Sequence, residues 1–214
     1  HAAGLLTRKR QRAAGNFGKQ ITAAMQTLGM AGGIFEVSIR PRADASPGAQ
    51  GLDVIEFMVS ANPGQPVQLL SKVASGGELS RISLSIQVIS ADSETIPTLI
   101  FDEVDSGIGG GVAEIVGQKL RALASNRQVL CVTHLPQVAA QAHRQMQVSK
   151  LAGDNVTRTS IRELSTDERI DELARMLGGM KITRQTREHA REMLKQGQQQ
   201  MPRGTRKSKR KAGA

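Results

Sequence analysis

The sequence predicts an α/β fold that contains a parallel sheet. A short apolar run over 98–100 and the adjacent Phe101 are followed by a helical pattern near 111–124 and by a second apolar run over 128–132. Strand, helix and strand in this order is typical of two parallel strands joined by a helical crossover. Two acidic residues directly follow the first run, and a serine with two glycines opens a helix earlier in the chain. Both features suggest a site that handles phosphate and metal.

The run Ser75-Gly76-Gly77-Glu78 predicts the start of that helix. A Ser-Gly-Gly turn offers unpaired backbone N–H groups and a hydroxyl at the positive end of the helix dipole, where a phosphate binds readily. The apolar residues that follow at spacings of three or four predict one buried stripe, and they are Leu79, Ile82, Ile86 and Ile89. A plainer interpretation stays open, because Ser-x-x-Glu is also the pattern of a simple capping box.

Asp102 and Glu103 end the first apolar strand, which is the Walker B arrangement of nucleotide-hydrolysing ATPases. In that arrangement one carboxylate serves Mg²⁺ and the next serves the attacking water. Asp105 follows, and the second strand ends in Thr133-His134. A lone histidine after a strand is commonly a surface or core residue, and adjacent acids are common at helix ends. The order of the whole series favours the functional interpretation.

This series resembles the C-terminal half of an ATP-binding-cassette ATPase. The resemblance assigns a signature motif to 74–78, Walker B to 99–103, a D-loop to 104–107 and a switch histidine to His134. It implies the C-terminal lobe of a P-loop NTPase head of the ABC/SMC type, with ATP and Mg²⁺ as ligands. Heads of this kind close as a homodimer around two ATP molecules.

The resemblance also implies a role for each side chain. Glu103 and His134 would be catalytic, the first polarising the hydrolytic water and the second touching the γ-phosphate. Asp102 would help to hold Mg²⁺ through water. The nucleotide-binding set on the face toward the opposing subunit's ATP would be Ser75, Gly76, Gly77, Glu78 and Asp105, of which Asp105 couples the two sites across the dimer.

Three further segments narrow the resemblance to the bacterial DNA repair family RecN, a relative of the SMC ATPases. They are 60–64 (SANPG), 133–140 (THLPQVAA) and 174–179 (ARMLGG). The similarity runs from about Leu28 to about Leu194. It implies a part in recombinational repair of DNA double-strand breaks, with DNA as a partner. Transporter ATPases usually carry Gln where this chain has Glu78, which favours the repair branch.

No P-loop of the form Gly-x-x-x-x-Gly-Lys-Ser/Thr occurs in the sequence. The segment most similar to this motif is 15–20 (GNFGKQ). When its Gly18-Lys19 is aligned with the Gly-Lys of the motif, Ala13 stands in place of the first glycine and Gln20 in place of the Ser/Thr that carries the hydroxyl. In RecN-like proteins the P-loop lies far toward the N-terminus, beyond a long coiled coil. We therefore expect this chain, which begins at His1, to be a C-terminal portion that needs an N-terminal Walker A half and does not hydrolyse ATP alone.

The composition limits the classes of partner. Aromatic residues make up 2% with no Trp or Tyr, so recognition of nucleic acid by stacked rings is not expected. The net charge is +10, and the excess comes from five basic residues over 8–19 and six over 203–211. The C-terminal run can bind nucleic-acid phosphates or can be a disordered, solubilising tail, and both interpretations stay open.

The expected organisation is the end of a coiled-coil arm over 1–29, the half-head over 30–197 and a basic tail over 198–214. Within the half-head we expect a hairpin over 34–60, strands near 145–149 and 156–162 that complete the sheet, and a last helix capped by Thr183 and ending near Lys195. Cys131 is expected to be a buried thiol. Without a signal peptide or spanning segment, a cytoplasmic protein is expected, and the RecN resemblance implies a bacterial, nucleoid-associated one.

Two other functions remain as alternatives. One is the ATPase subunit of a membrane transporter, which would carry a helical subdomain before the signature motif. The other is a non-catalytic, basic nucleic-acid-binding module that retains a degenerate ATPase half. Salt-sensitive binding that depends on 203–211 would favour the second alternative.

Overall fold

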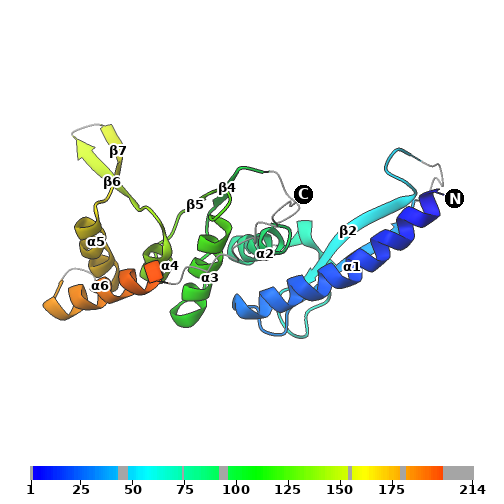
Figure 1. Ribbon diagram of the computed structural model, residues 1–214, viewed down its shortest axis with the longest axis horizontal. Helices are drawn as coiled ribbons and strands as arrows, with labels where there is room; N and C mark the ends of the chain where they lie inside the picture. Colours follow the sequence, from blue (N-terminus) through cyan, green and yellow to red (C-terminus); the bar gives the residue numbers. More distant parts are fainter. Residues whose placement is uncertain are drawn as a thin grey trace, which may run out of the picture.

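The computed structural model describes residues 2–42, 48–73, 75–91, 96–153, 156–178 and 182–199. The molecule is elongated, with α1 and the hairpin β1–β2 at one end and α5, α6 and β6–β7 at the other (Figure 1). The elements in chain order are α1 (Ala2–Thr27), β1 (Ile34–Pro41), β2 (Asp53–Ser60), β3 (Gln68–Leu69), a 3₁₀ turn η1 (Leu70–Lys72), α2 (Gly76–Ile89), β4 (Thr98–Phe101), α3 (Gly110–Leu123), β5 (Gln128–Cys131), α4 (Pro136–Gln141), β6 (Met146–Gly153), β7 (Val156–Glu163), α5 (Thr166–Gly178) and α6 (Arg184–Gln199).

The predicted crossover is confirmed. Strands β4 and β5 pair in parallel, with Thr98 opposite Gln128 and Phe101 opposite Cys131, and α3 connects them. One face of this pair packs on the main core, which α1, β1, α2, α3 and α4 also build. The other face presents Ile100, 72% exposed, together with Leu130 and Val132.

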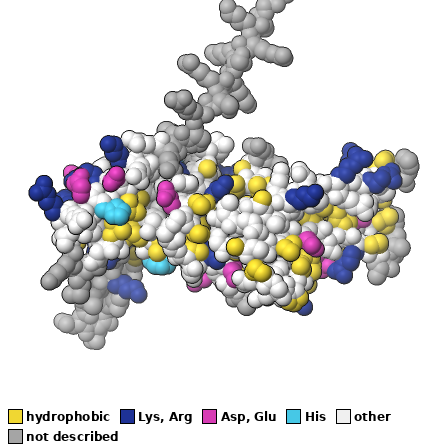
Figure 2. All heavy atoms as spheres, turned by 90° about the horizontal axis from the view of Figure 1, so that it is seen from below, with side chains coloured by type: hydrophobic (Ala, Val, Ile, Leu, Met, Phe, Trp, Pro, Cys, Tyr) yellow, Lys and Arg dark blue, Asp and Glu magenta, His cyan; other side chains and the backbone are white. Residues whose placement is uncertain are grey.

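At the N-terminal end, α1 packs along the antiparallel hairpin β1–β2, as the alternating pattern over 34–60 predicted. The helix continues through both of its inner glycines, and Gly18 allows close packing because an added Cβ would lie 3.1 Å from the carbonyl oxygen of Phe35. The ring of Phe17 on α1 clusters with the rings of Phe35 and Phe57 on the hairpin. Lys and Arg side chains are visible over this end of the molecule (Figure 2).

The prediction that the late strands complete the parallel sheet is wrong. Strands β6 and β7 pair with each other, residue for residue over their whole length, as a separate two-stranded sheet. Only two residues separate Gly153 from Val156 in the sequence, which makes this local antiparallel pairing favourable, whereas joining β4 or β5 would require a longer-range contact. Helices α5 and α6 pack with α4 around a second small core that contains Leu173, Ala174 and Leu194.

Three smaller expectations need adjustment. Leu79 lies outside the buried stripe of α2 and is 41% exposed, because the helix turns Ile82 and Leu84 toward the core. The last helix is capped by Thr183, as predicted, but it continues to Gln199, past the predicted end near Lys195 and two residues into the expected tail. Ala74, Gly179 and the basic run over 203–211 lie outside the described residues.

None of the helices in the described ranges combines the length and the apolar character that a membrane-spanning helix needs.

Candidate nucleotide site

Two acidic side chains lie where β4 ends, as the sequence predicted. Phe101 and Val104 are buried on either side of them and anchor the backbone, while Asp102 and Glu103 are exposed. The N–H of Glu103 donates to Asp102 Oδ1 over 2.9 Å, and the Ser80 hydroxyl donates to the carbonyl oxygen of Asp102 over 2.6 Å. Glu103 has a φ of 55°, a left-handed conformation that is uncommon outside glycine and is frequent at functional turns.

Helix α2 begins beside these acids. Ser75 is its N-cap and accepts a hydrogen bond from the Glu78 N–H over 3.3 Å. The Glu78 carboxylate does not return to the N-cap backbone and instead accepts from the Asn62 side-chain amide over 3.4 Å. The capping-box interpretation is therefore half right, because Ser75 caps the helix but Glu78 does not complete the box.

The two glycines of α2 let other parts of the chain approach the helix start. A Cβ on Gly76 would lie 2.2 Å from Glu103 Oε2, so the Glu103 carboxylate lies in the space that this glycine leaves. A Cβ on Gly77 would lie 2.9 Å from Ser106 Cβ and 3.0 Å from Ser106 O. The structure thus brings the acidic pair, the D-loop (104–107) and the signature glycines together within one chain, a contact that the sequence did not predict.

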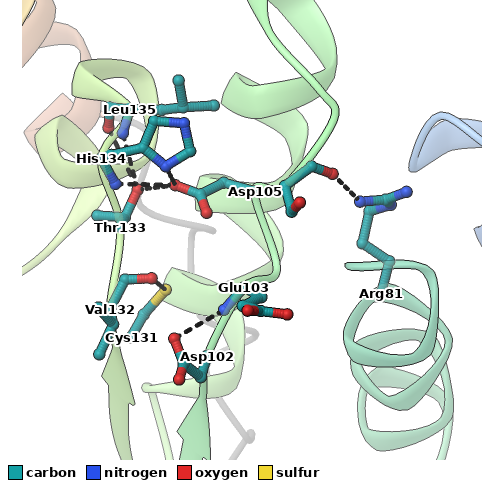
Figure 3. Close-up of polar contacts among 10 residues, drawn as sticks. Arg81, Asp102, Glu103, Asp105, Cys131, Val132, Thr133, His134 and Leu135 are labelled. Atoms are coloured by element: carbon teal, nitrogen blue, oxygen red, sulfur yellow. Dashed lines mark hydrogen bonds and ion pairs between the residues drawn. The ribbon is translucent and has the colours of Figure 1, made fainter. Parts of the chain in front are cut away.

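The D-loop also contacts the switch loop (132–135) after β5. Asp105 is buried and accepts hydrogen bonds from the Thr133 hydroxyl and from the His134 N–H, the latter over 3.0 Å (Figure 3). His134 Nδ1 lies 3.3 Å from the same carboxylate oxygen. The coupling of Asp105 to a second site across a dimer stays a prediction, because its carboxylate is turned into its own chain here.

Arg81 holds the D-loop in place, a role that the sequence did not predict. Its guanidinium is buried and donates to Ser106 O over 2.7 Å, and burial lowers its pKa, with Glu78 acting in the opposite direction. An arginine on a helix is usually exposed, so the sequence held no signal that this side chain turns inward.

Cys131 lies at the end of β5 with its side chain half-buried. Burial, followed by the nearby carboxylates of Asp105 and Asp102, raises the pKa of its thiol to about 12. The thiol is therefore protonated at neutral pH and is unsuited to act as a nucleophile.

The carboxylate oxygens at this edge of the sheet suit a hard cation that is bound mainly by the phosphates of a nucleotide. Within the described residues, no three His, Cys, Asp or Glu side chains gather as a metal cluster. Mg²⁺ is commonly bound by one or two carboxylates together with water and substrate phosphates. The exposed Asp102 fits that requirement, and the amides at the start of α2 fit an anion.

The sequence of the chain is similar to those of known DNA repair proteins. Proteins named DNA repair protein RecN are similar to the chain at 47% identity over 198 residues in Xylella fastidiosa strain 9a5c and at 48% over 194 residues in Vibrio cholerae. These alignments cover 92% and 90% of the chain. The chain spans 36% and 35% of the length of these two relatives. No family model matches.

Solved structures of SMC heads share the fold. The Smc head domain of Pyrococcus yayanosii, with a coiled coil and joint, superposes on 77% of the chain and 29% of that protein with a TM-score of 0.55 at 20% identity. A structure from work on ATP-driven dimerization and DNA-stimulated activation of SMC ATPases covers 84% of the chain and 99% of its own length, with a TM-score of 0.50 at 18% identity. The α/β fold is thus that of an SMC-type ATPase head, as predicted.

Proposed function

We propose that this chain, which belongs to the RecN family of DNA repair proteins, forms one half of an ATPase head that acts in repair of DNA double-strand breaks. The observation that carries the proposal is the meeting of the acidic pair, the start of α2 and the switch loop at one end of the β4–β5 pair. In open α/β sheets, ligands bind beyond the carboxyl ends of parallel strands.

Bound ATP and Mg²⁺ would supply the reacting phosphate and neutralise its charge. Asp102 would hold the cation through water with its exposed carboxylate, and Glu103 would polarise the attacking water. His134, whose side chain is exposed, would touch the γ-phosphate. Ser75 and Gly76 would face the ATP held by an opposing head, because both are exposed at the helix start, whereas Gly77 is buried against Ser106 and would hold the D-loop beside them.

The uncovered face of the parallel strands β4 and β5 supports the proposal that a second segment packs against it. Parallel strands are normally covered on both faces, yet Ile100, Leu130 and Val132 are exposed here. We assign that place to the N-terminal half that carries Walker A. The active unit would be a homodimer of complete heads acting on DNA in the bacterial cytoplasm, near the nucleoid.

ATP turnover by the full-length protein that contains this chain tests the proposal. Glu103→Gln should lower turnover by on the order of 10² to 10⁴, as for the loss of a positioned general base, while ATP still binds and the closed dimer accumulates. Glu192→Gln is the matched control, because it makes the same change on the exposed face of α6. Unchanged turnover in Glu103→Gln would exclude Glu103 from this role.

Dimerisation tests the assignment of the α2 start. Ser75→Arg should leave ATP binding intact and abolish ATP-dependent dimerisation in sedimentation experiments, because the large cation would stand between the two heads. Ser125→Arg, an equal change at an exposed position just after α3, should dimerise normally. Normal dimerisation of Ser75→Arg would contradict the cross-subunit role.

The same experiments separate the alternatives. A transporter ATPase would carry a helical subdomain before α2, but the chain has the hairpin β1–β2 there, and its relatives are repair proteins. A non-catalytic nucleic-acid-binding module would show no ATP turnover in the full-length protein and no response to Glu103→Gln. DNA-stimulated turnover that disappears in Glu103→Gln would exclude it.

A further inference from the structure

The buried carboxylate of Asp105 is the least expected feature of the nucleotide site. Its side chain is 3% exposed, whereas the His134 side chain that it contacts is 73% exposed. Two donors converge on the single oxygen Oδ2, namely the Thr133 hydroxyl and the His134 N–H, and the His134 ring nitrogen Nδ1 lies 3.3 Å from the same oxygen. Figure 3 shows this convergence from the switch loop onto the D-loop.

A buried carboxylate needs hydrogen bonds that replace the water it has lost. In the part of the chain that the structure describes, the hydrogen bonds to the Asp105 carboxylate come from the Thr133 hydroxyl and the His134 N–H. The contacts hold both the backbone and the ring of His134. With Nδ1 against the carboxylate, the second ring nitrogen is turned away from Asp105 (Figure 3) and is the one left for a ligand.

The other end of the D-loop is fixed as well. Arg81 donates to Ser106 O over 2.7 Å, and Gly77 leaves the space that Ser106 fills. The loop is therefore held between α2 on one side and the switch loop on the other. Asp105 is therefore held in one position between them. A carboxylate can orient a neighbouring imidazole only if it is itself held in place.

We infer that Asp105 is a positioning residue for His134 within the same chain. It holds the ring so that the outward nitrogen, Nε2, faces the γ-phosphate, and Thr133 completes the support by donating its hydroxyl to the same oxygen. A carboxylate that orients a functional histidine is a general device in enzymes. This inference rests on the proposed ATPase function, and it gives Asp105 a role that needs no second head.

A double-mutant cycle in the full-length protein tests the inference. Asp105→Asn and His134→Ala should each lower kcat for ATP, the first by about 10- to 100-fold as for the loss of a supporting partner, with KM changed less than about twofold. The double variant should be no slower than His134→Ala, because Asp105 acts only through the histidine. Losses that multiply would overturn the inference.

Thr133 provides an independent pair of variants. Thr133→Val keeps the shape and removes the hydroxyl, so kcat should fall about 10-fold, whereas Thr133→Ser keeps the hydroxyl and should remain near wild type. Equal activity of the two would overturn the inference even if Asp105→Asn failed to fold. Asp167→Asn, a change at an exposed aspartate of α5, is the matched control and should leave kcat unchanged.

Wild type and Glu103→Gln measured alongside distinguish the two levels of failure. If the wild-type full-length protein shows no ATP turnover, the proposed ATPase function fails, and the inference about Asp105 fails with it. If Glu103→Gln abolishes turnover but the losses of Asp105→Asn and His134→Ala multiply, only the positioning role fails.

Discussion

Helices α2 and α5 both begin with Ser-x-x-Glu, but the two helix starts are built differently. At α5, Glu168 accepts from the Ser165 N–H over 2.8 Å and Ser165 accepts from the Glu168 N–H over 3.4 Å, which is a complete capping box. At α2, Ser75 accepts from the Glu78 N–H, while the Glu78 carboxylate turns to Asn62.

The residues between Ser and Glu account for the difference. At α5 they are Thr166 and Asp167, both exposed, and the helix start is closed by its own side chains. At α2 they are two glycines, against which Glu103 and Ser106 pack from elsewhere in the chain. The same pattern therefore serves helix stability at α5 and lets Glu103 and Ser106 pack against the helix start at α2. Three changes test this contrast.

The largest effect is expected for Gly77→Ala. The new Cβ would lie 3.0 Å from the backbone oxygen of Ser106, so the D-loop would have to move. We expect a cost of about 1–3 kcal/mol in the free energy of unfolding, as for other overpacked sites, together with reduced ATP turnover by the full-length protein. Chemical denaturation and steady-state kinetics measure the two effects.

Gly76→Ala is the matched control for Gly77→Ala. Its Cβ would meet only the end of the flexible Glu103 side chain, which can swing away. The free energy of unfolding should change by less than about 0.5 kcal/mol, because the position is exposed and the end of a flexible side chain can move out of the way of a methyl group. Equal destabilisation by the two substitutions would refute the proposed difference between the two glycines.

A smaller effect is expected for Ser165→Ala at the other helix. Loss of the N-cap hydroxyl should lower the free energy of unfolding by about 1 kcal/mol. Ser165→Thr retains a capping hydroxyl and should recover most of this loss. Thermal unfolding compares the two variants, and an unchanged melting temperature in Ser165→Ala would show that the box does not stabilise α5.

The smallest change in the free energy of unfolding at neutral pH is expected for Glu168→Gln, since glutamine can still accept from the Ser165 N–H. This substitution is distinguished by how its effect on stability depends on pH. Hydrogen bonds from the Ser165 backbone, then from Arg162 and the Ser165 hydroxyl, lower the pKa of Glu168 to about 2. A carboxylate whose pKa is lower in the folded state stabilises the fold above its ordinary pKa, and that contribution disappears as the pH falls toward 2.

Melting temperatures measured between about pH 6 and pH 2 test this prediction. The wild type should exceed Glu168→Gln at the upper end, and the difference should shrink between about pH 4.5 and pH 2. Glu78→Gln is measured alongside as the comparison at α2, because the wild-type Glu78 carboxylate accepts from Asn62 and not from the N-cap backbone. A difference between wild type and Glu168→Gln that grows on acidification would contradict the assignment.

Much of the fold followed from local patterns. The apolar spacing predicted the β4–α3–β5 crossover, and alternation predicted the β1–β2 hairpin, because each depends on residues that are close in the chain. The separate β6–β7 sheet and the exposed Leu79 were not predicted. Both depend on which surfaces meet in three dimensions, which periodicity alone does not specify.

The sequence by itself determined which chemical groups the site contains. The Ser-Gly-Gly turn, the acidic pair at a strand end and the histidine after the next strand can be recognised without coordinates, because their types and order resemble those of an ATPase head. Only the tertiary structure decided how those groups meet. Asp105 and Thr133 are 28 residues apart, and Arg81 reaches Ser106 across 25. Such contacts arise from packing of helices and strands against a common core, so no local pattern records them.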